Sequence, residues 1–241
     1  MNKPYTSFPE LVLHCDANLD YRVQVTDRGA KATIICIHGG AIEPLTSELA
    51  AAIAGAEHNL YDLTGLRAED NRQLRIPVAR FEEVRLFTLL KRSHIAVSID
   101  GVPGVDPMVH LGGCNVLLKQ ILNNQLTQAG YRVCVPYTSG AAHDPSRFYN
   151  APIAGGVLLE LNSTLRAEMT AESLSGMSWQ QPSSWQGSFF RFTAAVRSAL
   201  QTYTDQADSD LARALYQFEA TTRQIPHELR SGPHQDKKPS I

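Results

Sequence analysis

The chain has 241 residues, of which 22 are lysine or arginine and 24 are aspartate or glutamate, so its formal charge is −2. This balance argues against nucleic acid or an anionic membrane as the main partner, and no apolar run approaches the roughly 20 residues that cross a bilayer. The N-terminus lacks a signal-peptide pattern, and the four cysteines lie far apart without a CxxC pair. We therefore expect a soluble cytoplasmic protein, which lysis would release if a phage encodes it.

Short β-rich runs alternate with helical patterns between residues 20 and 205. The expected strands cover 21–25, 33–37, 58–63, 94–99, 131–135 and 156–161, and several are apolar along their whole length. Helical patterns follow Pro44, occupy roughly 80–92, run from Gly112-Gly113 to Gly130, and cover 189–203. This alternation predicts a single α/β domain with a mixed, mostly parallel sheet flanked by helices.

The C-terminal part of the chain has a different composition. Residues 206–222 have the pattern of a polar amphipathic helix, and residues 226–241 have the composition of a disordered tail. The predicted organisation is an α/β domain over residues 1–205, followed by the polar helix and tail over 206–241.

The densest chemical signal is the segment ICIHGGAIEPLTSELA, residues 35–50. His38 follows an apolar strand, and Glu43 and Pro44 begin the next helix, with Pro44 suited to its first position. Ligands of open α/β sheets bind at the carboxyl ends of strands, where an imidazole and a carboxylate supply two of the three protein ligands of a catalytic zinc ion. The alternative is that His38 caps the turn and Glu43 complements the helix dipole.

Two further strands end in polar residues. Asp100, in AVSIDGVPG, either completes the metal site, orients His38, or belongs to an ordinary Asp-Gly turn. Glu160 lies inside the apolar strand GVLLEL, and an unpaired buried carboxylate is costly. It is a candidate general base, with Arg166 as a binder of a substrate carboxylate. The alternative is a structural Glu160–Arg166 ion pair or an edge-strand position for Glu160.

The other histidines carry weaker signals. His110 and His143 fall in loops expected to face the same edge of the sheet, where either would bind substrate or replace a metal ligand. His14, His58, His94, His227 and His234 have no clustered partner and are interpreted as structural or solvated. No phosphate-binding glycine motif and no nucleophilic triad can be singled out by spacing.

Together these segments resemble the zinc-dependent poly-γ-glutamate hydrolases of bacteriophages and bacteria. The resemblance covers about residues 5–204 and rests most strongly on HGGAIEPLTSELAAAIAG (38–55). The supporting elements are YTSFPELVLHC, DYRV, SIDG (98–101), LGGCN (111–115), HDPSRFYN (143–150), GGVLLELNSTLR (155–166) and FTAAVRSAL (192–200). The resemblance implies a metallocarboxypeptidase-like fold and a single Zn²⁺.

The resemblance also implies roles for individual residues. His38, Glu43 and, at the third place, Asp100 would hold the zinc ion, and Glu160 would be the general base. Arg166 would bind a substrate carboxylate. Further substrate contacts are expected from Arg147, His110, His143 and Asn150.

Two positions depart from the family pattern. Asp100 stands where the family usually has histidine, and by charge counting this brings the site with its zinc ion from about +1 to near neutral, so that water is acidified less. The outcomes are an enzyme with a shifted pH optimum or metal preference, a weak metal site, or a lapsed enzyme. Leu45 replaces the usual glycine of EPGTSE, a change expected to affect only the start of the helix.

The primary hypothesis is a zinc-dependent hydrolase of γ-glutamyl amide bonds in poly-γ-glutamate or a related acidic polymer, acting as a monomer. A second hypothesis is an amidohydrolase or carboxypeptidase that acts on another N-acyl or γ-linked amino acid. A third is a binding module without catalysis, in which the change to Asp100 has cost the metal. Because the net charge is −2, a polyanionic substrate requires a local basic groove, for which Arg147, Arg166, Lys119 and Arg132 are candidates.

Overall fold

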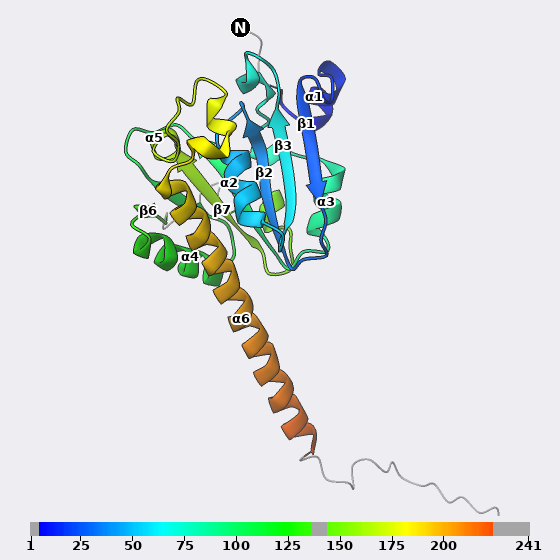
Figure 1. Cartoon of the computed structure of the whole chain (residues 1–241). Helices are drawn as coiled ribbons and strands as arrows, with labels where there is room; N and C mark the ends of the chain where they lie inside the picture. Colours follow the sequence, from blue (N-terminus) through cyan, green and yellow to red (C-terminus); the bar gives the residue numbers. More distant parts are fainter. Residues whose placement is uncertain (1–4, 136–143, 224–241) are drawn as a thin grey trace, which may run out of the picture. The chain divides into compact units, whose positions relative to one another are not determined.

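A seven-stranded mixed sheet forms the centre of the fold, with the strand order β1-β3-β2-β4-β7-β5-β6 (Figure 1). The computed structural model describes residues 5–135 and 144–223, with side chains of the second range described as far as residue 211. The strands are β1 (Tyr21–Thr26), β2 (Ala32–Gly40), β3 (Asn59–Gly65), β4 (Ile95–Val102), β5 (Val109–Gly112), β6 (Val133–Cys134) and β7 (Gly156–Asn162).

Most neighbouring strands are parallel. The parallel pairs are β2 with β3, β2 with β4, β4 with β7, and β5 with β6, whereas β1 with β3 and β5 with β7 are antiparallel. The predicted α/β fold with a mixed, mostly parallel sheet is therefore confirmed. The expected metallocarboxypeptidase likeness stays a prediction.

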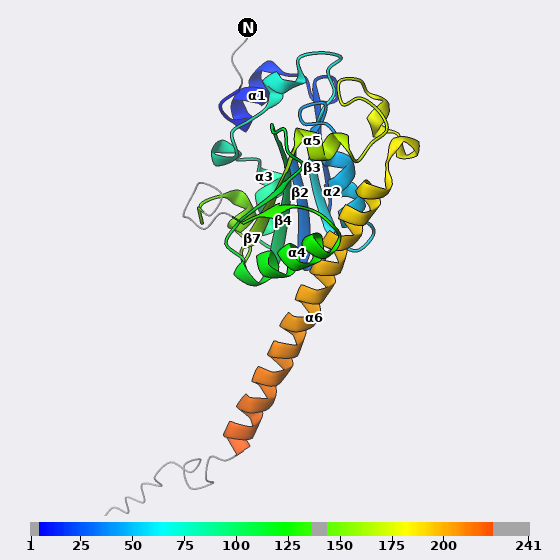
Figure 2. The same cartoon turned by 90° about the vertical axis from the view of Figure 1, so that its left-hand side faces the viewer.

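Helices cover both faces of the sheet (Figure 2). The α-helices are α1 (Phe8–His14), α2 (Thr46–Ala54), α3 (Val84–Leu90), α4 (Val116–Gln128), α5 (Ser163–Ala167) and α6 (Gly187–Arg223). The 3-10 helices are η1 (Asn71–Leu74), η2 (Val78–Arg80), η4 (Phe148–Asn150), η5 (Ser178–Gln180) and η6 (Pro182–Ser184). Helices α1 and α3 lie on one side of the sheet, and α2 lies on the other. None of the described helices is long and apolar enough to cross a membrane.

The main core cluster lies between the sheet and the layer of α1 and α3. It joins Ile35 and Ile37 of β2 and Leu63 of β3 to Leu11 of α1 and Leu86 of α3, and all five are at most 1% exposed. Burial on this scale contributes about 1.5–3 kcal/mol for each large apolar side chain. The core thus fixes the strands whose carboxyl ends carry the candidate site.

Three elements differ from the sequence-based prediction. β5 occupies residues expected to form a loop, because four residues between a Pro/Gly-rich segment and Gly113 are too few to show a strand pattern. β6 has only two residues instead of five. The helices expected at 189–203 and 206–222 are one continuous helix, α6, because no glycine or proline lies between Gly187 and Pro226 to stop it.

The chain divides into two units, Met1–Gln201 and Thr202–Ile241. The boundary falls within α6 and lies close to the predicted limit of the α/β domain at residue 205. The tail predicted over 226–241 lies outside the described residues.

A β-bulge in β2 decides where His38 points. The register of β2 against β3 pairs Cys36 with Asp62 but Gly39 with Thr64, so β2 has one extra residue in this interval. Because side chains alternate between the faces of a strand, the extra residue brings His38 to the face of the sheet on which Asp100 lies. Bulges commonly redirect a side chain in this way beside functional sites.

Candidate metal centre

The turn that carries His38 and Glu43 is held by its own backbone. Glu43 N donates to His38 O at 3.0 Å, and Thr46 Oγ1 donates to Glu43 O at 2.7 Å. Gly40 has a φ of +61°, and a Cβ atom there would lie 2.6 Å from Gly65 O. Only glycine accepts both this left-handed backbone and this close approach without strain.

The same turn is tied to β3 through buried polar side chains. Ser47 Oγ accepts from Gly40 N at 3.0 Å and donates to Asp62 Oδ1 at 2.8 Å, while Thr64 Oγ1 donates to Asp62 Oδ2 at 3.1 Å. Burial raises the pKa of Asp62, and the bonds from Ser47 and Thr64 oppose that rise. Asp62 therefore holds the glycine turn in place from the neighbouring strand.

Helix α2 begins two residues later than expected. Its first residue is Thr46, so Pro44 lies before the N-cap and not at the first helical position. The N-cap is Leu45, with a φ of +77°, a left-handed backbone that favours glycine. The left-handed conformation costs a leucine about 1–2 kcal/mol, which is offset here by the complete burial of the side chain.

His38, Glu43 and Asp100 converge, as predicted for metal ligands. One potential ligand atom from each lies within 4.8 Å of the other two. His38 Nδ1 is 2.7 Å from Asp100 Oδ1 and 3.9 Å from Glu43 Oε1. The three residues are 0%, 8% and 2% exposed for His38, Glu43 and Asp100. Two carboxylates buried this deeply require compensating positive charge.

The hydrogen bonds of His38 account for its protons. Nε2 lies 2.8 Å from Ile76 O, an acceptor, so Nε2 carries a proton, and the close contact of Nδ1 with Asp100 requires a second proton or a cation. Burial lowers the pKa of His38, but the charge and hydrogen bond of Asp100 outweigh burial and raise it. For Asp100, burial raises the pKa, but the charge and the hydrogen bond of His38 outweigh burial and lower the pKa to about 2. With the second proton in place, the two side chains form an imidazolium–carboxylate pair.

Glu43 is the second carboxylate of the cluster. Burial and then the charge of Asp100 raise the pKa of Glu43 to about 7, against the opposing charge of His38. Its Oε1 accepts from Arg75 Nε at 2.7 Å, and its Oε2 accepts from the backbone N–H of Gly101. Arg75 also places an Nη atom 4.0 Å from Asp100 Oδ2. Arg75 thus supplies positive charge to both carboxylates.

Glu160 lies in the same cross-strand row as Asp100. The two residues are register partners in β7 and β4, and His110 of β5 is the register partner of Glu160 on its other side. Directly paired residues share one face of a sheet, so all three side chains leave the same face. His110 therefore lies on a strand beside Glu160, not in a loop.

The carboxyl group of Glu160 has no hydrogen bond or ion pair within the described part of the chain. Burial raises its pKa, followed by the charge of Asp100, while Arg75 lowers it. Glu160 lines a cavity of about 300 Å³ together with Arg75, Arg147 and Tyr149. Glu160, the predicted general base, therefore faces a cavity beside the cluster of His38, Glu43 and Asp100.

Arg166 follows β7 on α5 and lines a second cavity, of about 250 Å³, with Glu43, Arg72 and Arg75. It donates to Pro44 O at 2.6 Å and to Leu161 O at 3.3 Å. Among the residues that the structure describes, it forms no ion pair, with Glu160 or with any other acid. The alternative of a Glu160–Arg166 ion pair is therefore excluded.

The other predicted substrate contacts occupy varied positions. Arg147 shares the cavity of Glu160 and lies 3.6 Å from Asp144 Oδ2. Asn150 is buried, and its side chain accepts from Cys114 N and donates to Asp144 O, both at 2.9 Å. His143 lies outside the described residues. The roles of these residues stay predictions.

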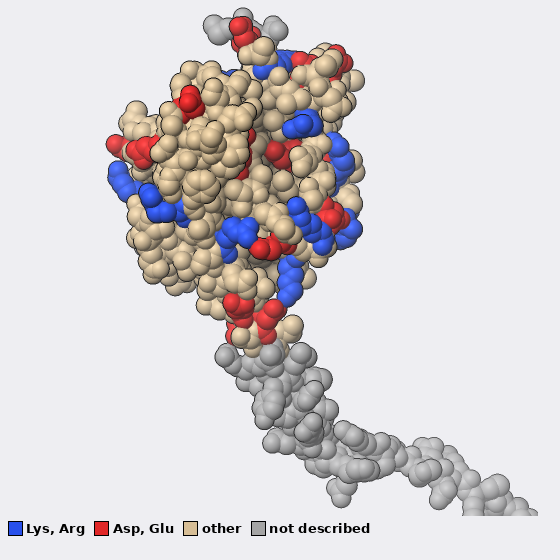
Figure 3. Space-filling model, viewed as in Figure 1, with Lys and Arg blue, Asp and Glu red and all other residues tan. Residues whose placement is uncertain are grey.

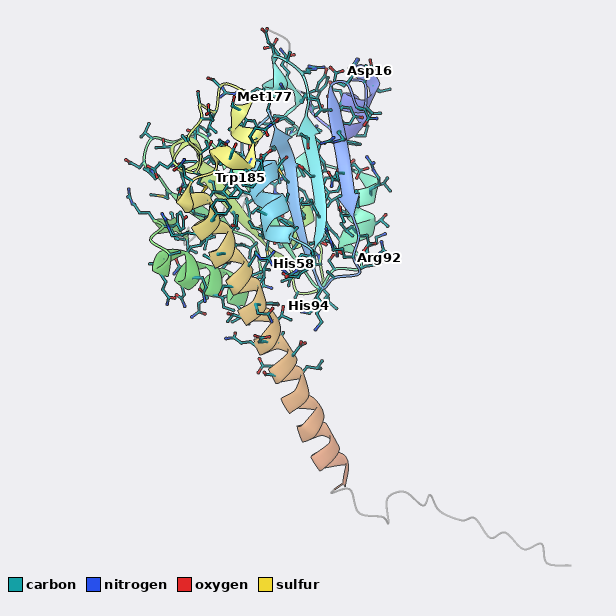
Figure 4. The ribbon with its side chains drawn as sticks, in the orientation of Figure 1. Asp16, His58, Arg92, His94, Met177 and Trp185 are labelled. Atoms are coloured by element: carbon teal, nitrogen blue, oxygen red, sulfur yellow. The ribbon has the colours of Figure 1, made fainter. Side chains whose placement is uncertain are left out.

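Two other histidines, His58 and His94, are labelled in Figure 4. His58 and His94 precede β3 and β4, at the amino ends of these strands, whereas the cluster is at the carboxyl ends. In parallel strands the amino ends and the carboxyl ends lie at opposite edges of the sheet, so the length of a strand separates these histidines from the cluster.

Sequence reasoning missed Arg72, Arg75 and the carbonyl of Ile76. All three come from the connection after β3, whose carboxyl end faces the same edge as those of β2 and β4. The available signal was a pair of arginines three residues apart, the second of which, Arg75, lies between the apolar residues Leu74 and Ile76.

Positive charge gathers locally at the site and not over the whole surface. On the face in Figure 3, residues of both signs are interspersed. Of the predicted groove residues, Arg147 and Arg166 line cavities, whereas Lys119 and Arg132 line neither of the two.

The fold and the site define an α/β protein with a histidine–carboxylate donor set at the carboxyl ends of adjacent strands. A sequence model described as poly-gamma-glutamate hydrolase matches residues 5–195, and the chain belongs to that family. The predicted family is therefore confirmed.

Individual relatives agree with this assignment. The chain is 30% identical over 127 residues to UPF0714 protein YndL of Bacillus subtilis, covering 53% of this chain and 50% of YndL. The prophage-derived protein YoqZ of the same organism is also 30% identical over 127 residues, covering 53% of this chain and 46% of YoqZ. The chain thus matches about half the length of these relatives.

Two solved structures share the fold. A bacteriophage poly-gamma-glutamate hydrolase aligns with a TM-score of 0.78 at 22% identity, over 85% of this chain and 100% of its own. A zinc-free form of YndL aligns with a TM-score of 0.75 at 24% identity, over 83% of this chain and 98% of its own.

Proposed function

We propose that the chain is a zinc-dependent hydrolase of γ-glutamyl amide bonds in poly-γ-glutamate or a related acidic polymer. The observation that carries the proposal is the convergence of His38, Glu43 and Asp100 beside Glu160, whose carboxyl group has no partner among the described residues, in a chain of this family. The zinc-free state described for YndL supports zinc as the metal.

The donor set fits a zinc ion. Imidazole and carboxylate groups are both among the ligand types that zinc accepts in proteins. His38 Nε2 donates to Ile76 O at 2.8 Å, which orients Nδ1 toward Asp100, as in sites where a histidine ligand is fixed through its second nitrogen. His38 and Asp100 would give up their shared proton to bind the ion.

Arg75 bears on the change from histidine to Asp100. With two carboxylates and a neutral imidazole, the zinc site is close to neutral by charge counting. The guanidinium of Arg75 bonds to Glu43 and approaches Asp100, and so returns one positive charge to the site. This compensation favours a working enzyme with altered pH or metal preference over a lapsed one.

The chemistry requires a base, a binder of the substrate and an electrophile. A bound zinc ion would polarise the scissile carbonyl and acidify water. Glu160 would take a proton from the attacking water at its carboxylate and return it to the leaving nitrogen. Its raised pKa suits both steps, and Arg166 would bind a substrate carboxylate.

A non-catalytic binding module is the second candidate. The imidazolium–carboxylate pair of His38 and Asp100, with Arg75 on Glu43, already balances the buried charges without a metal. This observation favours a cleft that holds its ligand but does not cleave it.

Metal content separates the two candidates. The full chain, purified without a metal-affinity tag, is expected to hold near-stoichiometric zinc, which His38→Ala abolishes and the matched His58→Ala, at the other edge of the sheet, does not. No zinc in the wild type, with zinc recovered in Asp100→His, would support the binding module. Absence of zinc from both would contradict the ligand assignment.

Turnover tests the role of Glu160. Glu160→Gln is expected to keep zinc and to lower kcat on poly-γ-glutamate about 100- to 10,000-fold, the usual range for a general base. Glu168→Gln, an exposed change of the same kind, serves as the control. Full activity of Glu160→Gln would contradict the proposed base. A panel of N-acyl and γ-linked amino acids distinguishes the alternative amidohydrolase or carboxypeptidase.

A further inference from the structure

The cavity beside Glu43 is rich in guanidinium groups. Its lining includes Arg72, Arg75 and Arg166, and among the described lining residues Glu43 is the single acid. Arg75 is bonded to Glu43, and within residues 5–135 and 144–211 neither Arg72 nor Arg166 forms an ion pair, in a space of about 250 Å³. Such a cavity attracts an anion.

Arg166 is the fixed cation of this cavity. Its side chain is buried, with the residue only 5% exposed, and its described hydrogen bonds go to the carbonyl groups of Leu161 and Pro44. A buried charge without an opposite charge is strongly unfavourable. The bonds to backbone oxygens orient the guanidinium but do not neutralise it. The carboxylates of Glu43 and Asp100 are near enough to act on its charge, but they are bonded to Arg75 and His38, so Arg166 retains the capacity to bind an anionic ligand.

Arg72 is the exposed cation, and its backbone is firmly held. It lies in η1, between Asn71 and Leu74, which are 5% and 0% exposed. The side chain of Asn71 accepts from Arg67 N at 3.0 Å and donates to Arg67 O at 2.6 Å. The segment is therefore anchored to the core through Asn71 and Leu74, while the side chain of Arg72 is exposed to solvent.

The spacing of the two arginines in this segment directs them to one side. Arg72 and Arg75 are three residues apart, which is one turn of a 3-10 helix. Both line the same cavity. Arg75 is committed to Glu43 and Asp100, whereas Arg72 forms no ion pair within the described residues.

We propose that Arg72 and Arg166 form a carboxylate subsite in which Arg72 determines specificity by binding the free α-carboxylate of a γ-linked glutamate residue next to the scissile bond. This inference rests on the proposed function. In a γ-linked chain each residue keeps its α-carboxylate, separated from the amide carbonyl by two methylene groups and the α-carbon. Arg166 binds it from the buried side, and Arg72 closes on it from the solvent side.

Binding without turnover tests this subsite. The probe is a trimer of γ-linked glutamate, and its dissociation constant is measured by calorimetry at low salt on the full-length Glu160→Gln chain with its metal as purified. Arg72→Gln in this background is expected to weaken binding about tenfold, the loss of one charge-assisted hydrogen-bonding partner. Arg72→Lys should recover part of the loss.

Two controls decide whether the effect is specific. Arg80→Gln removes the same charge from an exposed arginine of η2 that lines neither cavity, and it should leave the dissociation constant within twofold. A trimer with its α-carboxylates converted to primary amides should bind weakly, and equally to the chains with and without Arg72. Because Arg72 is exposed, its replacement should not move the unfolding midpoint.

Three results would overturn the subsite: no binding of the trimer to the Glu160→Gln chain, equal effects of Arg72→Gln and Arg80→Gln, or an equal loss for the amide trimer. Hydrolysis is measured separately on the wild-type chain. Binding that depends on Arg72, with no hydrolysis, would refute the proposed enzyme and retain the subsite. Hydrolysis by the wild-type chain, with binding that does not depend on Arg72, would support the proposed enzyme and refute the subsite.

Discussion

The two sides of the candidate site are built in different ways. The strand-end side, with His38, Glu43, Asp100 and Glu160, comes from the carboxyl ends of adjacent strands and from a turn whose hydrogen bonds are mostly local. The arginine side, with Arg72, Arg75 and the carbonyl of Ile76, comes from an irregular connection that meets the strand ends only after folding. The comparison shows that the donors are set by the sheet, whereas the charge around them is set by a loop.

The largest expected effect on stability comes from a substitution in the turn on the strand-end side. Gly40→Ala places a Cβ atom at a φ of +61° and 2.6 Å from Gly65 O, and should lower the free energy of unfolding by about 3 kcal/mol. Gly29→Ala is the matched control, because Gly29 has a φ of +66° with no atom within 4 Å. It should cost about 1 kcal/mol, for the backbone alone. Equal losses in urea unfolding would show that close packing at Gly40 is unimportant.

A smaller effect on stability is expected from a substitution that disturbs the arginine side alone. Asn71→Ala removes the two hydrogen bonds to Arg67 and should destabilise the chain by about 2 kcal/mol. Zinc content should remain, because no donor moves, while binding of the γ-linked trimer should weaken as it does in Arg72→Gln. Asn124→Ala, at an exposed position of α4, should change neither property. Loss of zinc in Asn71→Ala would show that the two sides are not separable.

The smallest effect concerns a carboxyl group on α2. Glu48 Oε2 is buried and has no hydrogen-bond partner among the described residues, and burial raises the pKa of Glu48 to about 7. A group whose pKa is raised by folding stabilises the protein at low pH and loses that contribution as pH rises through the folded pKa. The gain in stability of Glu48→Gln over the wild type should therefore grow as pH rises from 5 toward 8.

The measurement for Glu48 is the free energy of unfolding as a function of pH. Glu82→Gln removes one charge from an exposed position and is the matched control. A difference between Glu48→Gln and the wild type that does not grow with pH would show that Glu48 is ionised without cost in the folded chain.

Much of the fold follows from local sequence. Apolar runs separated by helical patterns predicted six of the seven strands, and Gly130 was expected just past a helix end, where it has a φ of +90°. β5 escaped prediction because a strand of four residues is stabilised by its neighbours and not by its own pattern. The polar residues at the strand ends could also be predicted, because each of them interrupts an apolar run.

By itself the sequence determined which side chains stand at the carboxyl ends of the strands, because HGGAIE and the positions of Asp100 and Glu160 depend on short-range pattern. Tertiary structure decided how they meet. The bulge that brings His38 to the face of Asp100 arises from the pairing of β2 with β3, and the proton on His38 Nε2 is held by Ile76, 38 residues away. The positive charge of Arg75 and Arg72 reaches the site only because buried neighbours fix their loop against the sheet, a long-range contact that no local pattern encodes.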